Sequence, residues 1–426
     1  MAICLFEDVS ISTLLPLTHV NPDFDLRSGI HTLRARLLQY FDQEPMQLFT
    51  RMGLAPAMEE RSGLPVNRRD AADLFVSGST VLRPELVHRI RAHRGQDRVF
   101  VHDGRMLAAT VGSDALREKI YAWLTAGLLR EELVHHPGAL PDLEAFEADI
   151  EDVQTAPFTY PWDLLTHNTQ LLLDDAAFFS LGHVDDSAEI AASAELFRPG
   201  DIAIGADVRI GPGAVLDASD GPVIVDAGAV IMPQALVMGP AYIGRDSRVK
   251  AGAKIYEGST VGPVCKVGGE VEETIFHSYA NKQHDGFVGH SYFAPWTNVG
   301  ADSNTSDLKN NYSRIRVTLE GRGHDTGLHF LGTVMADHSK CGINTMFNTG
   351  TVVGVGCNIY GGDFPPKFLP SFSWGGAAGV TEHDFTRFAE TASVVMQRRN
   401  KVLTEAERHL LHEVFVQTAG QRSDAP

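Results

Sequence analysis

The chain has 426 residues, of which 43% are hydrophobic and 21% charged, so it is long enough for two or three domains with ordinary cores. Its formal charge of -18 repels phosphate backbones and anionic lipid surfaces, which makes nucleic acid and membrane poor partners. Its apolar runs are shorter than the ~20 residues that span a bilayer. Acidic residues near the N-terminus disfavour a signal peptide, so we expect a cytoplasmic location.

Residues 1–180 alternate between strand and helix patterns. Short apolar runs typical of buried strands occur at 2–6, 46–49, 74–76 and 99–101. Helical spacing occurs at 30–40 and 84–92. The alternation predicts an α/β domain over 1–180. A connector rich in proline and aromatic residues is expected at 156–168, followed by a helix over 171–179.

After residue 181 the spacing of apolar residues changes to a period of six. Small residues follow many of them, as the corners of a triangular coil require. This pattern predicts a left-handed parallel β-helix of hexapeptide repeats over 181–385. A helical tail is expected over 386–426, with a capping box at Thr404 and Glu407. Eight repeats hold one phase: Val225, Ile231, Val237, Ile243, Val249, Ile255, Val261 and Val267.

The six-residue period fails at 273–298 and again at 301–329, where we expect loops to leave the coil. Histidine is the usual general base near neutral pH, and lysine binds phosphate as a point charge. Together they suit acyl transfer onto a phosphorylated sugar, although each histidine alone is as well explained as a hydrogen-bonded loop residue. The segment 277–312 concentrates such side chains: His277, Lys282, His284, Asp285, His290, Tyr292, Asn298, Asn311 and Tyr312.

The order of these motifs resembles the acetyltransferase half of the bifunctional N-acetylglucosamine-1-phosphate uridylyltransferase/glucosamine-1-phosphate acetyltransferase family. That family carries a lysine, a His-x-x-Tyr, an Asn-Ile-Gly-Ala-Gly and an Asn-Tyr-Asp in this order. The corresponding motifs here are Lys282, His290-Ser-Tyr292, Asn298-Val-Gly-Ala301 and Asn311-Tyr312.

The resemblance implies that His290 is the base that deprotonates the acceptor amine. Because the lysine-to-histidine gap is shorter than in the family, His284 is a second candidate for the base. The resemblance also implies a homotrimer, with acetyl-CoA or another acyl-CoA as the donor. It assigns Lys282, Tyr292 and Asn298 to the sugar phosphate, and it places along the acyl-CoA groove Ala301, Asn311, Tyr312 and Thr333.

The first half resembles sugar-phosphate nucleotidyltransferases in a shortened form, through Leu15-Pro-Leu-Thr18 followed by Asn21-Pro22. No glycine precedes Gly29, so the glycine-rich phosphate loop of that family is missing or rebuilt. Residues 74–78 end in serine and glycine where the family has a metal-binding aspartate. Mg²⁺ and a nucleoside triphosphate are therefore expected only if this half is active. An anionic ligand or simple surface charge would explain Arg27, Arg34 and Arg36.

Two further segments each allow two interpretations. Residues 337–348 carry Asp337, His338, Lys340, Asn344 and Asn348, and they suit an asparagine ladder within the coil as well as a ligand site. The aromatic segment 364–376 suits a loop that closes over a ligand as well as a cap on the last coil.

The leading hypothesis is a transferase of sugar-phosphate or nucleotide-sugar metabolism, with a sugar nucleotidyltransferase fused to a CoA-dependent acyltransferase. A zinc hydratase of the γ-carbonic anhydrase kind is an alternative that needs three histidines from adjacent coils. A non-enzymatic sugar-nucleotide-binding scaffold is the third. The histidines available to zinc are His277, His284, His290 and His338. No CxxC pair occurs, so buried thiols are expected rather than a metal site at Cys4, Cys265, Cys341 and Cys357.

Overall fold

The computed structural model describes residues 2–7, 9–128 and 143–423. The chain divides into two compact units, which we describe separately. Unit 1 comprises Met1–Leu26, His31–Tyr160 and Thr404–Glu413, and unit 2 comprises Arg27–Ile30, Pro161–Leu403 and Val414–Pro426. The domain ranges expected from the sequence, 1–180, 181–385 and 386–426, remain predictions. Within the described ranges, no helix is both long and apolar enough to cross a bilayer.

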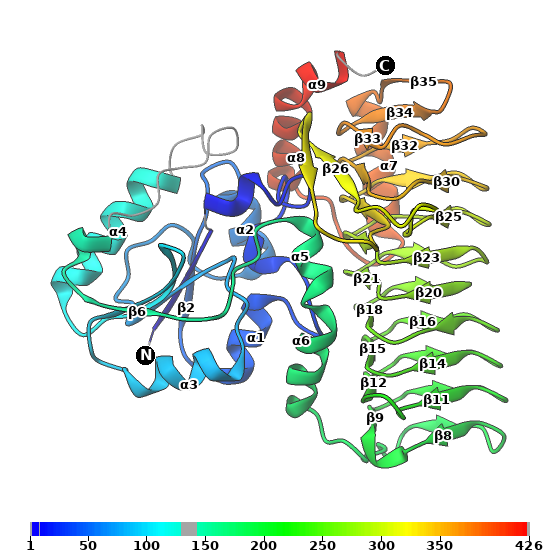
Figure 1. Ribbon diagram of the computed structural model, residues 1–426, viewed down its shortest axis with the longest axis horizontal. Coiled ribbons are helices and arrows are strands. Elements are labelled where there is room, and N and C mark those ends of the chain that lie inside the picture. The colour runs from blue at the N-terminus through cyan, green and yellow to red at the C-terminus, as the bar shows by residue number, and fades with distance from the viewer. Residues whose placement is uncertain (1, 8, 129–142, 424–426) are drawn as a thin grey trace. The chain divides into compact units, whose positions relative to one another are not determined.

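Unit 1 contains a six-stranded mixed sheet in the order β2-β1-β3-β5-β4-β6 (Figure 1). Strand β1 pairs in parallel with β2 and β3, whereas β5 runs antiparallel to β3 and β4. The four strands expected from apolar runs are confirmed as β1 to β4. The strand bounds are β1 Ile3–Phe6, β2 Met46–Phe49, β3 Leu74–Ser77, β4 Arg98–His102, β5 Arg105–Thr110 and β6 Asp149–Asp152.

The helices of unit 1 are α1 Leu33–Tyr40, α2 Ala55–Ser62, α3 Pro84–Ala92 and α4 Asp114–Leu128. Helix α3 has the predicted bounds. Helix α1 begins later than predicted, because the hydroxyl of Thr32 caps it by accepting a hydrogen bond from the backbone N–H of Ala35 (3.2 Å). In α4, Ile120, Tyr121 and Leu124 are buried in the core beside the sheet.

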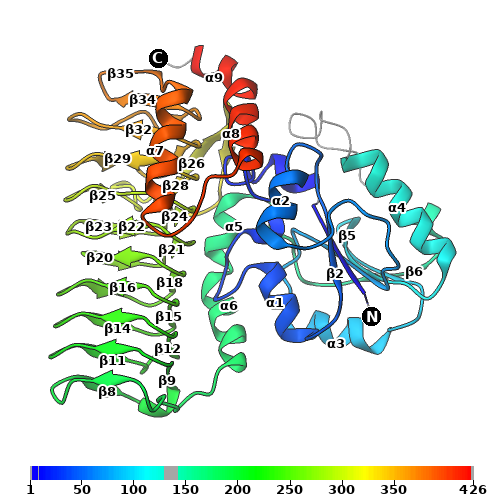
Figure 2. The same cartoon turned by 180° about the vertical axis from the view of Figure 1, so that it is seen from behind.

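Unit 2 is dominated by a β-helix whose strands form three parallel faces (Figures 1 and 2). The chain visits face 1, face 2 and face 3 in turn in each coil, which confirms the predicted left-handed parallel β-helix of hexapeptide repeats. Face 1 consists of β9 Ile202–Ile204, β12 Val223–Val225, β15 Ala241–Ile243, β18 Ser259–Val261, β21 Ile275–Phe276, β24 Tyr292–Phe293, β28 Thr333–Met335, β31 Thr351–Val353 and β33 Phe368–Leu369.

The other two faces are built in the same way. On face 2, the lone pairing residue Asn298 joins a lower and an upper ladder through bridges to Asn281 and Lys340. Face 2 consists of β7 Glu189–Ile190, β10 Arg209–Ile210, β13 Val230–Ile231, β16 Arg248–Val249, β19 Lys266–Val267, β22 Asn281–Lys282, β29 Lys340–Cys341, β32 Asn358–Ile359 and β34 Ser373–Gly376. Face 3 consists of β8 Glu195–Phe197, β11 Val215–Asp217, β14 Leu236–Met238, β17 Lys254–Ile255, β20 Glu270–Glu272, β23 Phe287–Gly289, β25 Asn304–Thr305 and β30 Met346–Phe347.

The prediction of a loop at 273–298 is wrong, because these residues form paired strands of the β-helix. Val230 pairs with Arg248 and Arg248 with Lys266, so these two coils have the same length on face 2. Lys266 then pairs with Asn281, which makes the next coil shorter. A shorter coil shifts the six-residue phase along the sequence while the strands stay paired, so the period disappears without any loop.

A true insertion leaves the coil after β25. The hydrogen-bonded pair Ser247 and Cys265 shows a regular coil of 18 residues, whereas the bonded pair Ser291 and Thr333 is 42 residues apart. The extra residues include an antiparallel hairpin of β26 Arg316–Leu319 and β27 Arg322–Asp325. An added Cβ at Gly350 of the coil would contact the buried hairpin residues Ile315 and Val317. The hairpin therefore packs against the β-helix beside β31.

Residues 27–30 and two helices cover face 1 of the β-helix. The helices are α5 Pro161–Thr166 and α6 Asn168–Asp175, so part of the expected connector is helical. The Thr260 hydroxyl donates a hydrogen bond to the carbonyl of Gly29 (3.1 Å). The backbone N–H of Ile30 donates to Asp175 (2.8 Å), and the Ile30 side chain packs with Tyr242 of face 1.

The aromatic segment 364–376 forms the last coil itself through β33 and β34, and β35 Gly379–Glu382 pairs with β34. Helix α7 Phe385–Gln397 follows (Figure 2). Its Phe388 packs edge-on against the ring of Phe372. The remaining helices are α8 Glu405–Gln417 and α9 Ala419–Ser423. The capping box is confirmed, because the Thr404 and Glu407 side chains each accept the other's backbone N–H (3.2 Å).

Candidate functional site

Three polar side chains lie at the same corner of three successive coils, where face 3 turns into face 1. Glu272 pairs with Gly289 and Val288 pairs with Thr305, so the two coils have equal length at this point. The residues that follow these strands are therefore in register as well. This register stacks Glu273, His290 and Asp307 along the β-helix axis.

The imidazole of His290 lies between the two carboxylates. Its Nδ1 is 2.8 Å from Oδ2 of Asp307, and its Nε2 is 3.4 Å from Oε2 of Glu273. The ring stacks on Phe330, which belongs to the end of the insertion, with centroids 5.0 Å apart. The His290 side chain is 15% exposed, whereas Glu273 is 46% exposed. The Nε2 side of the ring thus faces the more exposed of the two carboxylates.

The two carboxylates control the charge of the imidazole. Burial of the ring opposes protonation, but hydrogen bonds to Asp307 and Glu273 outweigh it and raise the pKa of His290 to about 9. The same hydrogen bond lowers the pKa of Glu273. Burial raises the pKa of Glu272 nearby. In the free protein His290 is therefore a cation at neutral pH, and a ligand that removes Glu273 from Nε2 would lower the His290 pKa and produce a base.

Glycine at two positions makes room for this arrangement. A Cβ on Gly289 would collide with the carboxylate of Asp307 and approach the ring of Phe287. A Cβ on Gly332 would collide with the carbonyl of Gly289. Close approach of the backbone to the Asp307 carboxylate therefore requires the missing side chain at residue 289.

The other predicted site residues lie elsewhere in the coil. His284 is exposed at the corner where face 2 turns into face 3, and Ala301 lies at that corner one coil further on. Asn298 lies on face 2. Within one chain, the structure therefore does not bring these three residues to the His290 corner.

Lys282 and Tyr292 are buried. Lys282 pairs with Val267 and takes the inward position of the six-residue repeat, and its Nζ donates a hydrogen bond to the carbonyl of His284 (2.6 Å). Burial lowers the pKa of Lys282 to about 8. The Tyr292 hydroxyl accepts a hydrogen bond from the backbone N–H of Arg27 (3.1 Å). Both side chains have structural partners in this structure.

The predicted acyl-CoA residues other than Ala301 come from two places, the insertion and face 1. Asn311 and Tyr312 are exposed within the insertion, and the Tyr312 carbonyl lies 2.9 Å from Nδ1 of His329. Thr333 begins β28, and its backbone N–H donates to the Ser291 hydroxyl (2.9 Å). The Thr333 hydroxyl is buried with no hydrogen-bond partner among the described residues.

The four histidines proposed for zinc are distributed over all three corners of the coil. His277 and His338 follow strands of face 1, whereas His284 and His290 lie at the other two corners. In the described ranges, no group of three or more His, Cys, Asp or Glu side chains is arranged to hold a metal ion. The four cysteines are buried free thiols, as expected.

The segment 337–348 extends over faces 2 and 3 of one coil, through β29 and β30, rather than forming one patch. His338 stacks on Trp296, and Lys340 donates through Nζ to the carbonyl of His338 (2.9 Å). The Asn348 side chain accepts the backbone N–H of Thr349 (2.8 Å). These contacts lie within the coil and are of the kind expected for a structural role.

In unit 1, the carboxyl ends of β1, β2 and β3 meet at one edge of the sheet, where α/β folds bind ligands. Glu7 follows β1 and forms a buried ion pair with Arg51, which follows β2 (2.7 Å). The hydroxyls of Ser77 and Ser79 lie 3.0 Å apart, and Arg105 donates to Ser79 (3.2 Å).

The three arginines singled out in the sequence are divided between the two units and have different partners. Arg34 is paired with Asp25 in unit 1 (2.6 Å), and Arg36 is buried there. Arg27 lies in unit 2, where it donates to the carbonyl of His277 (2.9 Å).

Sequence comparison supports the architecture derived so far. Residues 3–184 match the family model described as sugar nucleotidyl transferase. The chain is 25% identical over 193 residues to the bifunctional protein GlmU of Synechococcus sp. (strain CC9311), covering 44% of this chain and 37% of that protein. It is 24% identical over 203 residues to the bifunctional sugar-1-phosphate nucleotidylyltransferase/acetyltransferase of Sulfurisphaera tokodaii, covering 47% and 44%.

A segment similar to sugar nucleotidyl transferases is therefore followed in this chain by a hexapeptide-repeat β-helix. The chain is similar to bifunctional proteins of the GlmU kind, which confirms the resemblance expected from the sequence. The matched segments span less than half the length of these two curated relatives.

Comparison with solved structures also gave matches. A UDP-N-acetylglucosamine acyltransferase is 12% identical, with 57% of this chain and 96% of that chain covered and a TM-score of 0.21. A hexapeptide transferase family protein from Anaplasma phagocytophilum is 15% identical, with 56% and 90% covered and a TM-score of 0.18. TM-scores at this level are too low to support a functional argument.

Proposed function

We propose that the β-helix transfers an acyl group from acetyl-CoA or another acyl-CoA to an amine or hydroxyl of a sugar phosphate or nucleotide sugar. The observation that carries the proposal is the stack of Glu273, His290 and Asp307, because it orients an imidazole and leaves its Nε2 beside an exposed carboxylate. The Sulfurisphaera tokodaii relative is named as an acetyltransferase as well as a nucleotidylyltransferase, which supports the choice of chemistry.

In the proposed reaction, Asp307 accepts the Nδ1 proton of His290 in a hydrogen bond and fixes the ring orientation. The acceptor amine or hydroxyl replaces Glu273 at Nε2, and the Nε2 proton of the imidazolium leaves to solvent as the pKa of His290 falls. The acceptor then donates a hydrogen bond to the neutral Nε2. As the acceptor attacks the thioester carbonyl, its proton passes to Nε2. The C–S bond then breaks, and the proton returns from Nε2 to the departing CoA sulfur, so that the free thiol and the acylated sugar are released.

We further propose that the other predicted residues divide into candidates for ligand binding and residues with a structural role. Asn298 remains a candidate for the sugar phosphate. The contacts of Lys282 and Tyr292 favour a structural role, and His284 is too exposed and too distant in the coil to share the His290 site. For the acyl-CoA groove the candidates remain Ala301, Asn311, Tyr312 and Thr333.

Nucleotidyl transfer by unit 1 is the second candidate activity, supported by the family match over residues 3–184. Its substrates would be a nucleoside triphosphate and a sugar phosphate, with Mg²⁺. Among the described residues at the end of β1, Glu7 carries a carboxylate. It forms a salt bridge with Arg51 and so is not free to hold a metal ion. The test of this activity is release of pyrophosphate from UTP or dTTP. We propose a cytoplasmic homotrimer for the whole protein.

The acyl-transfer proposal is tested by measuring thiol release from acetyl-CoA with a panel of amino-sugar and sugar phosphates. His290→Ala is expected to lower the rate at least a hundredfold. His284→Ala is the matched control, because it removes an exposed histidine at another corner, and it is expected to leave the rate unchanged. Equal rates for His290→Ala and wild type would contradict the mechanism. Absence of turnover with every acceptor would favour the scaffold alternative.

A further inference from the structure

Face 2 of the β-helix carries a group of cations in a protein with a large negative charge. Arg248 pairs with Lys266 on adjacent strands, and Lys266 pairs with Asn281. Arg399, just after α7, donates from its guanidinium to the Asn281 side chain (3.0 Å) and is thereby held on this face. With Arg398 beside it, these residues form what we call the basic cluster: Arg248, Lys266, Arg398 and Arg399.

The basic cluster lacks the carboxylate partners that some exposed cations of the β-helix have. Lys254 on face 3 is paired with Glu270 (3.3 Å), and Arg198 with Asp201 (3.1 Å). In the described part of the chain, by contrast, no carboxylate forms a salt bridge with any member of the basic cluster. The chain has 54 acidic residues against 36 basic ones, so four neighbouring unpaired cations are a local exception.

The electrostatics of the cluster agree with this geometry. Burial and the charges of Arg399 and Arg248 lower the pKa of Lys266. Burial and the charges of Arg398 and Arg248 likewise lower the pKa of Arg399. Like charges repel one another in the free protein, and a bound anion would remove that repulsion.

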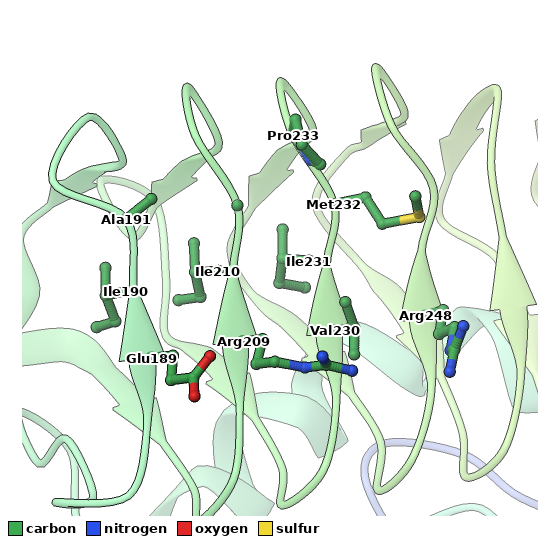
Figure 3. A pocket seen from close by; sticks show the side chains of 11 residues that line it. Glu189, Ile190, Ala191, Arg209, Ile210, Val230, Ile231, Met232, Pro233 and Arg248 are labelled. Carbon is green, nitrogen blue, oxygen red and sulfur yellow. The ribbon is translucent and has the colours of Figure 1, made fainter.

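A hollow on face 2 begins at Arg248 and extends toward the start of the β-helix. It has a volume of about 530 Å³, within the range of small-molecule sites, and it is lined in part by Arg209, Val230, Met232 and Pro233 (Figure 3). Glu189 lines its far end, beside Arg209. The hollow therefore provides mainly apolar and cationic surface next to the basic cluster.

We propose that the basic cluster binds the diphosphate group of a small molecule and that the face-2 hollow holds part of the molecule attached to it. Two phosphates fit better than one, because the cations come from adjacent strands about 4.8 Å apart and from the end of α7. Arg and Lys side chains supply the donors that phosphate oxygens accept. Face 2 is opposite the corner that carries His290, so within one chain this site is separate from the proposed acyl-transfer site.

Calorimetry with inorganic pyrophosphate tests the cluster. We expect the affinity for pyrophosphate to fall as salt is added. The Lys266→Gln and Arg399→Gln variants should each bind roughly tenfold more weakly than the wild type. Lys254→Gln is the control for a cation outside the cluster. Asn281→Ala removes the bond to Arg399 but keeps every charge, and it separates loss of charge from loss of position. Unchanged affinity in the Lys266→Gln/Arg399→Gln double variant, or no binding by wild type at millimolar pyrophosphate, would overturn the proposal.

Comparing the affinities of UDP and coenzyme A shows which kind of molecule supplies the diphosphate. One of the two is expected to bind more tightly than pyrophosphate. Val230→Asp, a substitution in the hollow, should remove this additional affinity and leave the affinity for pyrophosphate unchanged. If neither binds more tightly, the role given to the hollow is wrong. His290→Ala should abolish acyl transfer and leave pyrophosphate binding intact, so failure of the acyl-transfer proposal does not affect this test. Circular dichroism and ligand-free melting temperatures verify that each variant is folded.

Discussion

The carboxylate of Asp307 lies 2.8 Å from Nδ1 of His290, although 17 residues separate the two in the sequence. They meet because one coil of the β-helix is 17 residues long here, so the two residues occupy the same corner of successive coils. Glu273 occupies the same corner one coil earlier and completes the stack from the other side. The site is therefore a product of coil length as much as of residue type.

The first prediction concerns Asp307. Asp307→Asn leaves a side chain of the same size but removes the charge that orients His290 and favours its imidazolium. We expect the acyl-transfer kcat to fall about a hundredfold, with a smaller effect on KM, because the acceptor contacts are retained. Steady-state thiol release measures both constants. Asp285→Asn, at an exposed position of another corner, is the control, and a normal kcat for Asp307→Asn would argue against the dyad.

The second prediction concerns the pH dependence of stability. The pKa of His290 is about 9 in the folded protein against an ordinary value of 6.5, so folding binds a proton between these values. The stabilisation is fully present below about pH 6.5 and is lost as the pH rises through 9, with a total of about 3 kcal/mol. Urea unfolding at a series of pH values should show this loss in the wild type. It should be smaller in Glu273→Gln and absent in His290→Gln, and identical curves for all three would refute the assignment.

The third prediction concerns the buried Lys282. Its pKa is about 8 in the folded protein against 10.5 ordinarily, so charging it costs stability at neutral pH. Lys282→Met should therefore stabilise the protein by about 1–3 kcal/mol below pH 8, and the gain should disappear above pH 10.5. Denaturant unfolding measures the gain, and acyl transfer should be unaffected. Loss of activity without a gain in stability would instead support the sugar-phosphate role expected from the sequence.

The fourth prediction concerns the ion pair at the edge of the unit 1 sheet. The Glu7 side chain is fully buried and that of Arg51 is 11% exposed. Arg51→Met leaves a buried carboxylate without its partner, so we expect a loss of about 3–5 kcal/mol in the free energy of unfolding. Glu7→Gln combined with Arg51→Met should recover part of this loss. Arg68→Met, which breaks the exposed pair with Glu59, should cost less than about 1 kcal/mol.

The predicted and observed structures differ most where coil length changes. Residues 273–298 lost the six-residue phase and were expected to be a loop, yet they form paired strands, because shorter coils keep the same neighbours. Asp307 and Glu273 were missed for the same reason. A search for polar residues spaced by one coil would have found both, but only after the pairing of β20 with β23 had revealed the coil length.

By itself, the sequence determined the two kinds of fold, the phase of the inward residues from Val225 to Val267, and His290 as the leading candidate for the base. The first two features depend on local periodicity, whereas the choice of His290 came from the resemblance to the acetyltransferase family. The tertiary structure decided which corner each polar residue occupies. It also decided that Lys282 points into the coil and that Arg399 joins Arg248 and Lys266 on face 2. These placements depend on strand register and on packing between residues distant in the chain, which a one-dimensional pattern does not specify.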